Sequence, residues 1–241
     1  MRIFTKTDIG KMRSINQDAF FAKVLSNGSA FAVVCDGMGG ASAGDIASKT
    51  AVDIISQYFL NSYSPNMSSD DIAKLLNNAI LSANLEIYNL SLQNEQLQGM
   101  GTTVVAVVAS ENETVICNIG DSRAYLLGDD IKQITRDHSV VQSLVESGKL
   151  SPEQARTHPE KNIITRALGV EDDVLIDNYC VDIDKNDIIL LCTDGLSNLV
   201  DSNSLLNIVK SNDLDNITNK LIEQANSNGG KDNITVAVIA H

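Results

Sequence analysis

The sequence predicts an α+β protein in which antiparallel sheets are flanked by helices. Two observations lead to this fold class. Short apolar runs that are typical of strands cluster together, and segments with a helical spacing of apolar residues follow one another in pairs instead of alternating with the strands. With 241 residues, of which 43% are hydrophobic, the chain can bury a sizeable core. No repeat, linker or low-complexity segment divides it, so we expect one domain over residues 1–241.

The first part of the chain predicts three strands followed by two helices. Alternating or apolar runs indicate strands at residues 2–7, 19–25 and 29–36. A helical pattern then begins, so the Asp-Gly pair after the third strand starts a strand-to-helix turn and not a hairpin. The first helix covers the apolar stripe at 46–58, with a capping-box pattern from Ser42 to Asp45, and the second covers 72–90.

The middle and the end of the chain predict further strands and shorter helices. Four strands joined by short turns indicate an antiparallel meander, and the looser segment 137–169 that follows is expected to be a functional flap with one short helix at 140–146. Two more strands, two helices and a closing strand complete the chain. The expected strands are 101–109, 114–119, 123–127, 131–134, 175–181, 188–193 and 234–239, and the helices 202–210 and 213–225.

Five aspartates are candidate site residues, and four of them stand at strand ends or in loops beside glycines, where a carboxylate can face an open edge of the core. They come from five separate places in the chain. If they converge, two unit charges about 5 Å apart repel each other by about 3 kcal/mol at an effective dielectric constant of about 20. A cluster without a counter-charge would be strained or partly protonated. These residues are Asp18, Asp36, Asp121, Asp194 and Asp232.

Divalent cations would relieve this repulsion. Mg²⁺ and Mn²⁺ prefer oxygen ligands, keep several waters and need only a few carboxylates. Two such ions bridged by one carboxylate lower the pKa of a shared water to about 7 and hold the oxygens of a phosphoryl group during in-line attack. Arg13, in the polar loop between the first two strands, would grip the phosphate oxygens. The residues therefore indicate a metal-dependent phosphohydrolase.

The charge and composition exclude several classes of partner. The formal net charge of −13 argues against nucleic acid and against an anionic membrane surface, because both need basic patches. No apolar run approaches the length that spans a bilayer, and no signal peptide opens the chain. We expect a cytoplasmic monomer.

The cysteines and histidines carry no strong signal of their own. The four cysteines show no C-x-x-C spacing and lie in or beside apolar runs, so we expect buried thiols in a reducing compartment. Residues 117–123 spell the C-x5-R of cysteine-based phosphatases, but Asp121 inside that segment would repel a phosphate and the next residues continue as a strand. His138 and His158 are expected to be solvated flap residues and not metal ligands.

With these residues in view, the chain resembles the PPM family, the PP2C-type protein serine/threonine phosphatases, and among them the compact bacterial members. The resemblance extends from Arg13 to the closing strand and rests on motifs that occur in the order typical of the family. They are Arg13 with Asn-Gln-Asp at 16–18, Asp-Gly-Met-Gly-Gly at 36–40, Gly-Thr-Thr at 101–103, Gly-Asp-Ser-Arg at 120–123, Asp-His-Ser at 137–139, Thr-Arg-Ala-Leu-Gly at 165–169, Thr-Asp-Gly at 193–195 and Asp-Asn-Ile-Thr at 232–235.

The resemblance implies a four-layer αββα fold, with a central antiparallel β-sandwich flanked on both faces by pairs of helices and the metal site at one edge. It implies two Mn²⁺ or Mg²⁺ ions bridged by Asp36, and a third ion near the flap. The implied roles are the Gly37 carbonyl on one ion, Asp194 and Asp232 on the other, Asp18 through water, Asp121 with Asp194 on the third, and Arg13 on the phosphate.

One departure from the family pattern concerns the proton donor. Eukaryotic relatives often have a histidine, assigned as general acid, where this chain has Met38. A methionine cannot donate a proton, so the resemblance implies that a metal-bound water protonates the leaving group here.

The resemblance also implies the biological role. The substrates would be phosphoserine and phosphothreonine proteins, a cognate bacterial serine/threonine kinase would be a partner, and the enzyme would reverse the signalling of that kinase. The alternative is a catalytically weak regulatory module that binds a phosphoprotein or a kinase. Such modules typically lose metal ligands, whereas this chain keeps all five aspartates.

Overall fold

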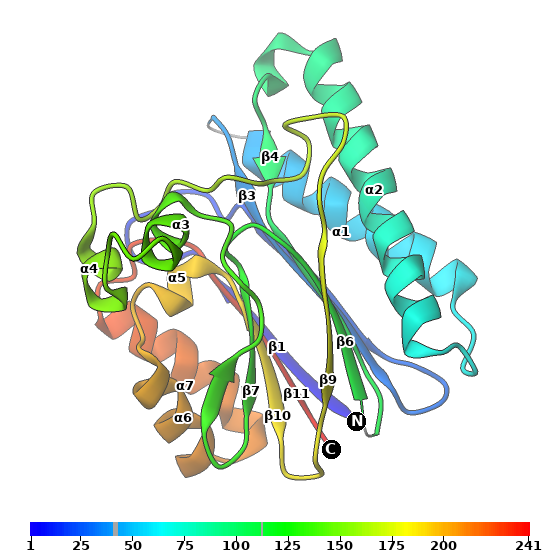
Figure 1. Cartoon of the computed structure of the whole chain (residues 1–241), viewed down its shortest axis with the longest axis vertical. Coiled ribbons are helices and arrows are strands. Elements are labelled where there is room, and N and C mark those ends of the chain that lie inside the picture. The colour runs from blue at the N-terminus through cyan, green and yellow to red at the C-terminus, as the bar shows by residue number, and fades with distance from the viewer. Residues whose placement is uncertain (41–42, 112) are drawn as a thin grey trace.

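The fold has four layers, with two antiparallel sheets packed face to face and a pair of helices on each outer face (Figure 1). The structure is a computed structural model that describes residues 1–40, 43–111 and 113–241. The predicted α+β class and the αββα order of layers are confirmed. All strand pairs between named strands are antiparallel.

One sheet joins the two ends of the chain, and the other contains most of the strands in between. The order in the first sheet is β1-β11-β10-β7-β8, and the order in the second is β2-β3-β5-β6-β9, with β4 paired to β3. The strands are β1 (Arg2–Asp8), β2 (Asp18–Val24), β3 (Ala30–Met38), β4 (Gly101–Thr102), β5 (Val104–Ala109), β6 (Glu113–Ile119), β7 (Arg123–Leu127), β8 (Ile131–Gln133), β9 (Asp177–Asp182), β10 (Ile188–Cys192) and β11 (Ile234–Ala240).

Three apolar clusters hold the layers together. The first lies under α1 and α2 and includes a stacked pair, Phe31 and Phe59, whose ring centroids are 4.1 Å apart. The second lies under α6 and α7, and the third fills the space between the sheets. Burial of such aliphatic side chains is the main stabilising contribution. The helices are α1 (Ala43–Ser62), α2 (Ser69–Gln93), α3 (Val140–Glu146), α4 (Pro152–Thr157), α5 (Asp194–Ser197), α6 (Ser202–Ser211), α7 (Leu214–Ser227) and the 3₁₀ helix η1 (Glu95–Leu97).

The predicted four-strand meander is wrong. Strands β5 and β6 pair in one sheet, but β7 and β8 belong to the other, so the chain crosses between the sheets at residues 120–122. Gly120 makes the crossing possible, because its φ is +99° and a Cβ there would lie 2.5 Å from the Thr103 side chain. The neighbour of β6 is instead β9, which follows the flap.

The predicted strand at 101–109 is divided in two at Thr103. Its first part, β4, pairs with the last two residues of β3, so β3 continues to Met38 and Asp36 lies within the strand and not at its end. The break at Thr103 occurs because its backbone and hydroxyl both bind Asp36. Strand β9 begins two residues later than predicted, at Asp177.

Three short helices were not predicted, namely α4, α5 and η1. Each has six residues or fewer, too few for apolar periodicity. The capping box of α4, formed by Ser151 and Gln154, was a signal that could have indicated it. The capping pattern predicted from Ser42 falls partly outside the described residues.

Two further observations concern solvent and membrane. Within the described residues, none of the helices combines the length and the apolarity that a bilayer crossing requires.

Cys35, Cys117 and Cys192 are buried as predicted, but Cys180 is exposed, because alternate side chains of β9 face solvent at this end of its sheet.

Candidate active site

Strand pairing brings the first two aspartates together. Asp18, the first residue of β2, is the direct partner of Asp36 on β3. Asp36 is held on its other side by Thr103, whose hydroxyl accepts a hydrogen bond from the Asp36 amide at 3.0 Å and whose amide donates to the Asp36 carbonyl at 2.9 Å. Thr103 therefore holds both the amide and the carbonyl of Asp36, independently of any contact of its carboxylate.

Asp18 is bound by the opposite sheet. One carboxylate oxygen, Oδ2, accepts hydrogen bonds from the hydroxyls of Thr193 at 3.0 Å and Thr235 at 2.7 Å. Thr193 follows β10 and Thr235 belongs to β11, so these contacts tie the two sheets together at this edge. The other oxygen, Oδ1, is buried and has no hydrogen-bond partner among the described residues.

Asp194 and Asp232 come from the first sheet. Asp194 is the first residue of α5, and its Oδ2 accepts a hydrogen bond from Asn198 at 2.9 Å, whereas its buried Oδ1 has no partner in the described part of the chain. Asp232 precedes β11 and forms an ion pair with Arg13, with Nη2 2.8 Å from Oδ2. The loop that carries Arg13 is thereby placed on Asp232.

Asp121 reaches the site through the crossing between the sheets. It lies between β6 and β7, and the next residue, Ser122, shares a buried hydrogen bond of 2.7 Å with the hydroxyl of Thr103. Thr103 therefore contacts both the strand of Asp36 and the turn of Asp121. The unexpected change of sheet is what brings this aspartate to the same edge as the others.

These residues surround a cavity of about 270 Å³. Asp36, Asp121, Asp194 and Asp232 line it, together with Arg13, so the structure brings together four of the five predicted aspartates with the predicted arginine. Asp18 lies behind them as the strand partner of Asp36. The lining residues are Arg13, Gln17, Asp36, Gly37, Met38, Gly39, Thr103, Asp121, Asn162, Ile164, Asp194, Asp232 and Asn233.

Gly37 lines the cavity at a position where no side chain fits. A Cβ there would lie 2.0 Å from the carbonyl oxygen of Gly44 and 2.6 Å from that of Gln17. The Gly37 amide donates to the same Gln17 carbonyl at 3.1 Å. The glycine thus allows the start of α1 and the Arg13 loop to pack directly against the strand.

The electrostatics of the cluster favour a bound cation. Burial, followed by the negative charges of Asp18 and Asp194, raises the pKa of Asp36 well above its usual range. Burial is also the largest cause for the others, raising the pKa of Asp18 to about 7 and that of Asp121 to about 8. The pKa of Asp194 rises to about 6 for the same reason, with Asp232 adding to the effect. A nearby positive ion would reverse these shifts.

The donor set fits Mn²⁺ or Mg²⁺. Every group in it is an oxygen ligand, as these hard cations prefer. The Oδ1 atoms of Asp18 and Asp194 are acceptors for which the described residues supply no hydrogen-bond donor. Among residues 1–40, 43–111 and 113–241, no three His, Cys, Asp or Glu side chains are grouped closely enough to hold an ion by themselves. An ion here would complete its coordination with backbone carbonyls and water.

Residues 117–123 do not form the cradle of a cysteine-based phosphatase. Cys117 is in the middle of β6, its Sγ lies 3.1 Å from the Asn178 side chain, and burial raises its thiol pKa to about 12. Arg123 forms an ion pair with Asp137 at 2.6 Å and does not face a phosphate site next to the thiol. A thiol that stays protonated is a poor nucleophile.

The predicted solvation of the flap histidines is wrong for His138. Its side chain is buried and contacts Asp177, whereas His158 is half-buried at the end of α4. Sequence reasoning also assigned no role to Thr103, Thr193 and Thr235, although all three stand in the recurring motifs. Their place in these motifs was the available signal, most directly for Thr193, which precedes Asp194.

Comparison with known proteins identifies the family. Residues 11–236 match the family described as Protein phosphatase 2C. The chain is 40% identical over 236 residues to the serine/threonine phosphatase stp of Listeria monocytogenes serotype 4b (strain F2365), covering 97% of this chain and 93% of that protein. The crystal structure of the serine/threonine phosphatase Stp1 from Staphylococcus aureus is similar with a TM-score of 0.93 and 35% identity, covering 99% of this chain and 94% of that one.

A further similar structure contains metal ions. The catalytic domain of the serine threonine protein phosphatase PstP was solved in complex with two manganese ions; it is 32% identical to this chain with a TM-score of 0.86, covering 98% of this chain and 96% of that one. The extent of these matches, together with the four-layer fold, leads to one assignment. The chain belongs to the protein phosphatase 2C family, the PPM family of metal-dependent protein serine/threonine phosphatases.

Proposed function

We propose that this protein hydrolyses phosphoserine and phosphothreonine in other proteins with a dinuclear Mn²⁺ or Mg²⁺ centre in the cavity. The observation that carries the proposal is the convergence of Asp36, Asp121, Asp194 and Asp232 with Arg13 around one opening. A site that concentrates negative charge needs cations before it can accept an anionic phosphate. The manganese complex of PstP supports the same metal dependence here.

We assign the ligands as follows. Asp36 would bridge the two ions, the Gly37 carbonyl would bind one, and Asp194 with Asp232 would bind the other. Asp18 would act through water, in keeping with its place behind the cavity, and Asp121 with Asp194 would hold a third ion. The ions, when bound, supply an activated water and neutralise charge on the transferring phosphoryl group.

The other residues of the site would bind and orient the phosphate. The Arg13 guanidinium, half-exposed at the cavity mouth, would hold phosphate oxygens with paired hydrogen bonds, exchanging part of its contact with Asp232 for them. Met38 lines the cavity but carries no proton to donate, so the leaving serine or threonine oxygen would take its proton from water.

The biological setting follows from this activity. We propose that the enzyme acts as a monomer in the cytoplasm, with one catalytic domain over residues 1–241 and a flap at 137–169 next to the cavity. Its substrates would be proteins phosphorylated by a bacterial serine/threonine kinase, whose signal it would reverse. Asn162 and Ile164 of the flap line the cavity, which supports a role of the flap in meeting the substrate.

The experiment that tests this proposal measures phosphate release from a phosphothreonine peptide by metal-stripped protein, with and without added Mn²⁺. We expect turnover only with Mn²⁺, and a loss of at least about 100-fold in Asp36→Ala and Asp194→Ala, which remove proposed metal ligands. Cys117→Ser is the matched control and should retain activity. A folded protein that binds Mn²⁺ but releases no phosphate would instead support the regulatory module.

A further inference from the structure

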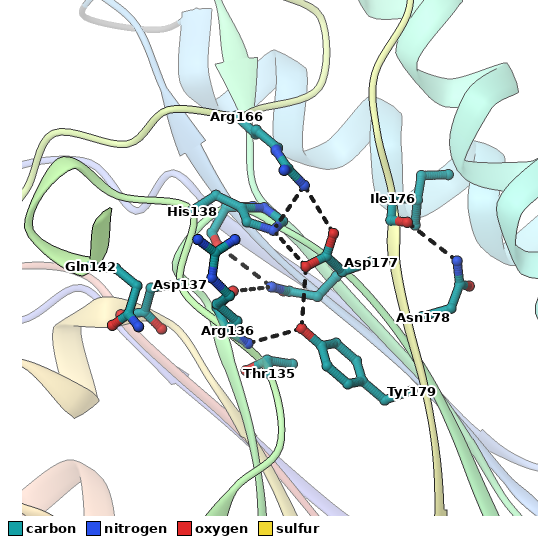
Figure 2. A network of polar contacts seen from close by, with 12 residues as sticks. Thr135, Arg136, Asp137, His138, Gln142, Arg166, Ile176, Asp177, Asn178 and Tyr179 are labelled. Atoms are coloured by element: carbon teal, nitrogen blue, oxygen red, sulfur yellow. Dashed lines mark hydrogen bonds and ion pairs between the residues drawn. The ribbon is translucent and has the colours of Figure 1, made fainter. Parts of the chain in front are cut away.

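His138 is buried at the base of the flap, between the crossing of the sheets and β9. Only 2% of its surface is exposed. Figure 2 shows Asp177 and Arg166 beside one edge of its ring, with Tyr179 on the far side of Asp177. None of these residues lines the 270 Å³ cavity, so the network lies outside the site described above.

His138 holds the peptide groups on both sides of Gly120. Its ring nitrogen Nδ1 accepts a hydrogen bond from the Gly120 amide at 3.0 Å, and its own amide donates to the Gly120 carbonyl at 2.9 Å. Gly120 directly precedes Asp121. The turn that carries Asp121 is therefore bound to the histidine through backbone groups, and it has little room to shift because Thr103 packs against Gly120.

These contacts determine the tautomer of the ring. Because Nδ1 accepts a hydrogen bond, the proton of the neutral ring is on Nε2, which lies 3.1 Å from Oδ2 of Asp177. Arg166 donates to Oδ1 of the same carboxylate at 2.9 Å. Arg166 Nη1 also lies 3.2 Å from Nε2 of His138. Both atoms then carry protons and donate to Asp177, so no hydrogen bond joins them.

Asp177 is itself positioned by a hydrogen bond from Tyr179. The hydroxyl of Tyr179 donates to it at 3.3 Å and accepts from the Arg136 amide at 3.0 Å (Figure 2). Burial lowers the pKa of His138, with Arg166 acting in the same direction and Asp177 against it, in agreement with a neutral ring.

The backbone of His138 also joins the two ends of the flap. The Thr165 amide, near the end of the flap, donates to the His138 carbonyl at 2.8 Å, and Ser139 forms an isolated bridge with Ile164. Both ends of the flap thus meet at His138, at the point where the Asp121 turn is also held. One residue connects the flap base, the Asp121 turn and β9.

We propose that His138 is a positioning residue that, as a neutral ring oriented by Asp177, places Asp121 for cation binding and couples that position to the base of the flap. This role rests on the proposed function of Asp121. His138 does not line the cavity, and its side chain affects Asp121 only through the Gly120 amide. Groups that orient ligands in this way commonly change metal affinity by about 10–100-fold when they are replaced.

Two amide variants of His138 test its two ring contacts separately, one with the Gly120 amide and one with Asp177. In His138→Asn the side-chain oxygen can replace Nδ1 as acceptor for the Gly120 amide, and in His138→Gln the amide nitrogen can replace Nε2 as donor to Asp177. We expect His138→Gln to raise the Mn²⁺ concentration for half-maximal activity about tenfold or more, with a smaller change in KM for the peptide. His138→Asn should keep most of the wild-type Mn²⁺ dependence. Mn²⁺ binding by calorimetry, without substrate, should show the same difference.

Several outcomes would overturn the proposal. A purely structural role would lower the melting temperature of both variants without separating their Mn²⁺ dependence. Imidazole ¹⁵N shifts of the wild-type protein must show Nε2 protonated, and an Nδ1–H tautomer would refute the geometry even if a variant fails to fold. If the wild type is active and His138→Gln has an unchanged Mn²⁺ dependence, the positioning role of His138 is refuted and the proposed function stands. No Mn²⁺-dependent turnover in the wild type would remove the proposed function, and this role with it.

Discussion

At the scale of single residues, the buried carboxylate of Asp121 lowers the free energy of unfolding of the metal-free protein at neutral pH. Burial and the charges of Asp194 and Asp137 raise its pKa to about 8, above the ordinary carboxyl value. A raised pKa means that folding loses stability as the pH rises from the ordinary value of about 4 through the folded value, because the unfolded chain ionises first.

Asp121→Asn should therefore stabilise the protein when metal is removed. The amide carries no charge at any pH, so we expect a melting temperature in EDTA that is higher by at least about 3 °C at pH 7.5. The gain should shrink toward pH 3, where the wild-type carboxyl is largely protonated in both states. Thermal unfolding of both proteins across this pH range measures it, and a variant that is less stable at pH 7.5 would contradict the repulsion.

Gly37 allows a different test at this scale. Gly37→Ala would place a Cβ 2.0 Å from the Gly44 carbonyl oxygen, so β3 and the start of α1 must separate. We expect a loss of about 2 kcal/mol or more in the free energy of unfolding. Gly40→Ala is the control, because none of the described residues beyond its chain neighbours has an atom within 4 Å of its added Cβ. Urea unfolding compares the two, and equal stability would show that the close packing at Gly37 is relaxed in solution.

The aspartates were predictable from the sequence, whereas the residues that hold them were not. A carboxylate next to glycine at the end of an apolar run is unusual enough to suggest a site. A buried threonine such as Thr193 or Thr235 is ordinary in a strand, and its bond to Asp18 exists only because two sheets meet there. The motifs contain these threonines, but no local pattern shows which distant carboxylate they bind.

At the scale of elements, the loop that carries Arg13 depends on one side chain from the turn before β11. Asn233 is buried; its Nδ2 donates to the carbonyls of Ile9 at 2.9 Å and Ile15 at 3.0 Å, and its Oδ1 accepts from the Gln17 amide at 2.8 Å. Both ends of the loop are thus tied to the residue after Asp232.

Asn233→Ala should release this loop. Because all three hydrogen bonds disappear, Arg13 would be positioned less well, and we expect kcat/KM for a phosphothreonine peptide to fall about tenfold or more. Lys231→Ala, a change at an exposed position of the same turn, is the matched control and should be near wild type. Steady-state kinetics with saturating Mn²⁺ measures both. Unchanged kinetics in Asn233→Ala would mean that the other contacts of the loop, such as its backbone bonds to Gly230, hold it without Asn233.

The elements themselves were predicted well where their apolar patterns are regular and uninterrupted. Helices α1 and α2 follow apolar stripes of many residues, and the buried strands β3 and β10 are short apolar runs. The meander failed because neighbouring strands in sequence usually pair, and local patterns do not reveal where a chain changes sheet. The four-residue helix that starts at Asp194 is too short to have a pattern.

At the scale of the whole molecule, the proposed ligands come from both sheets. Asp18 and Asp36 belong to the second sheet, and Asp194 and Asp232 flank strands of the first. The order of the motifs along the chain predicted this four-layer fold through resemblance to the family. Composition and periodicity alone predicted only antiparallel sheets with helices.

Metal binding should therefore stabilise the molecule as a unit. A ligand that binds only the folded state at about 100 times its Kd adds about 2.7 kcal/mol to the free energy of unfolding. We expect Mn²⁺ to raise the melting temperature by about 5 °C or more, with one cooperative transition. Calorimetric scans with Mn²⁺ and with EDTA measure it. The same increase in Asp194→Ala, or none in the wild type, would contradict the ligand assignment.

The place of β11 in its sheet has a consequence for protein synthesis. This strand lies between β1 and β10, and the turn before it carries Asp232 and Asn233. On the ribosome, β1 emerges first but finds its partner only after more than two hundred further residues have been made. A nascent chain can thus fold its second sheet and the helices that cover it while the hydrolytic centre stays unassembled. The hydrolytic centre would be completed only once β11 has docked between β1 and β10, so activity would appear late in folding.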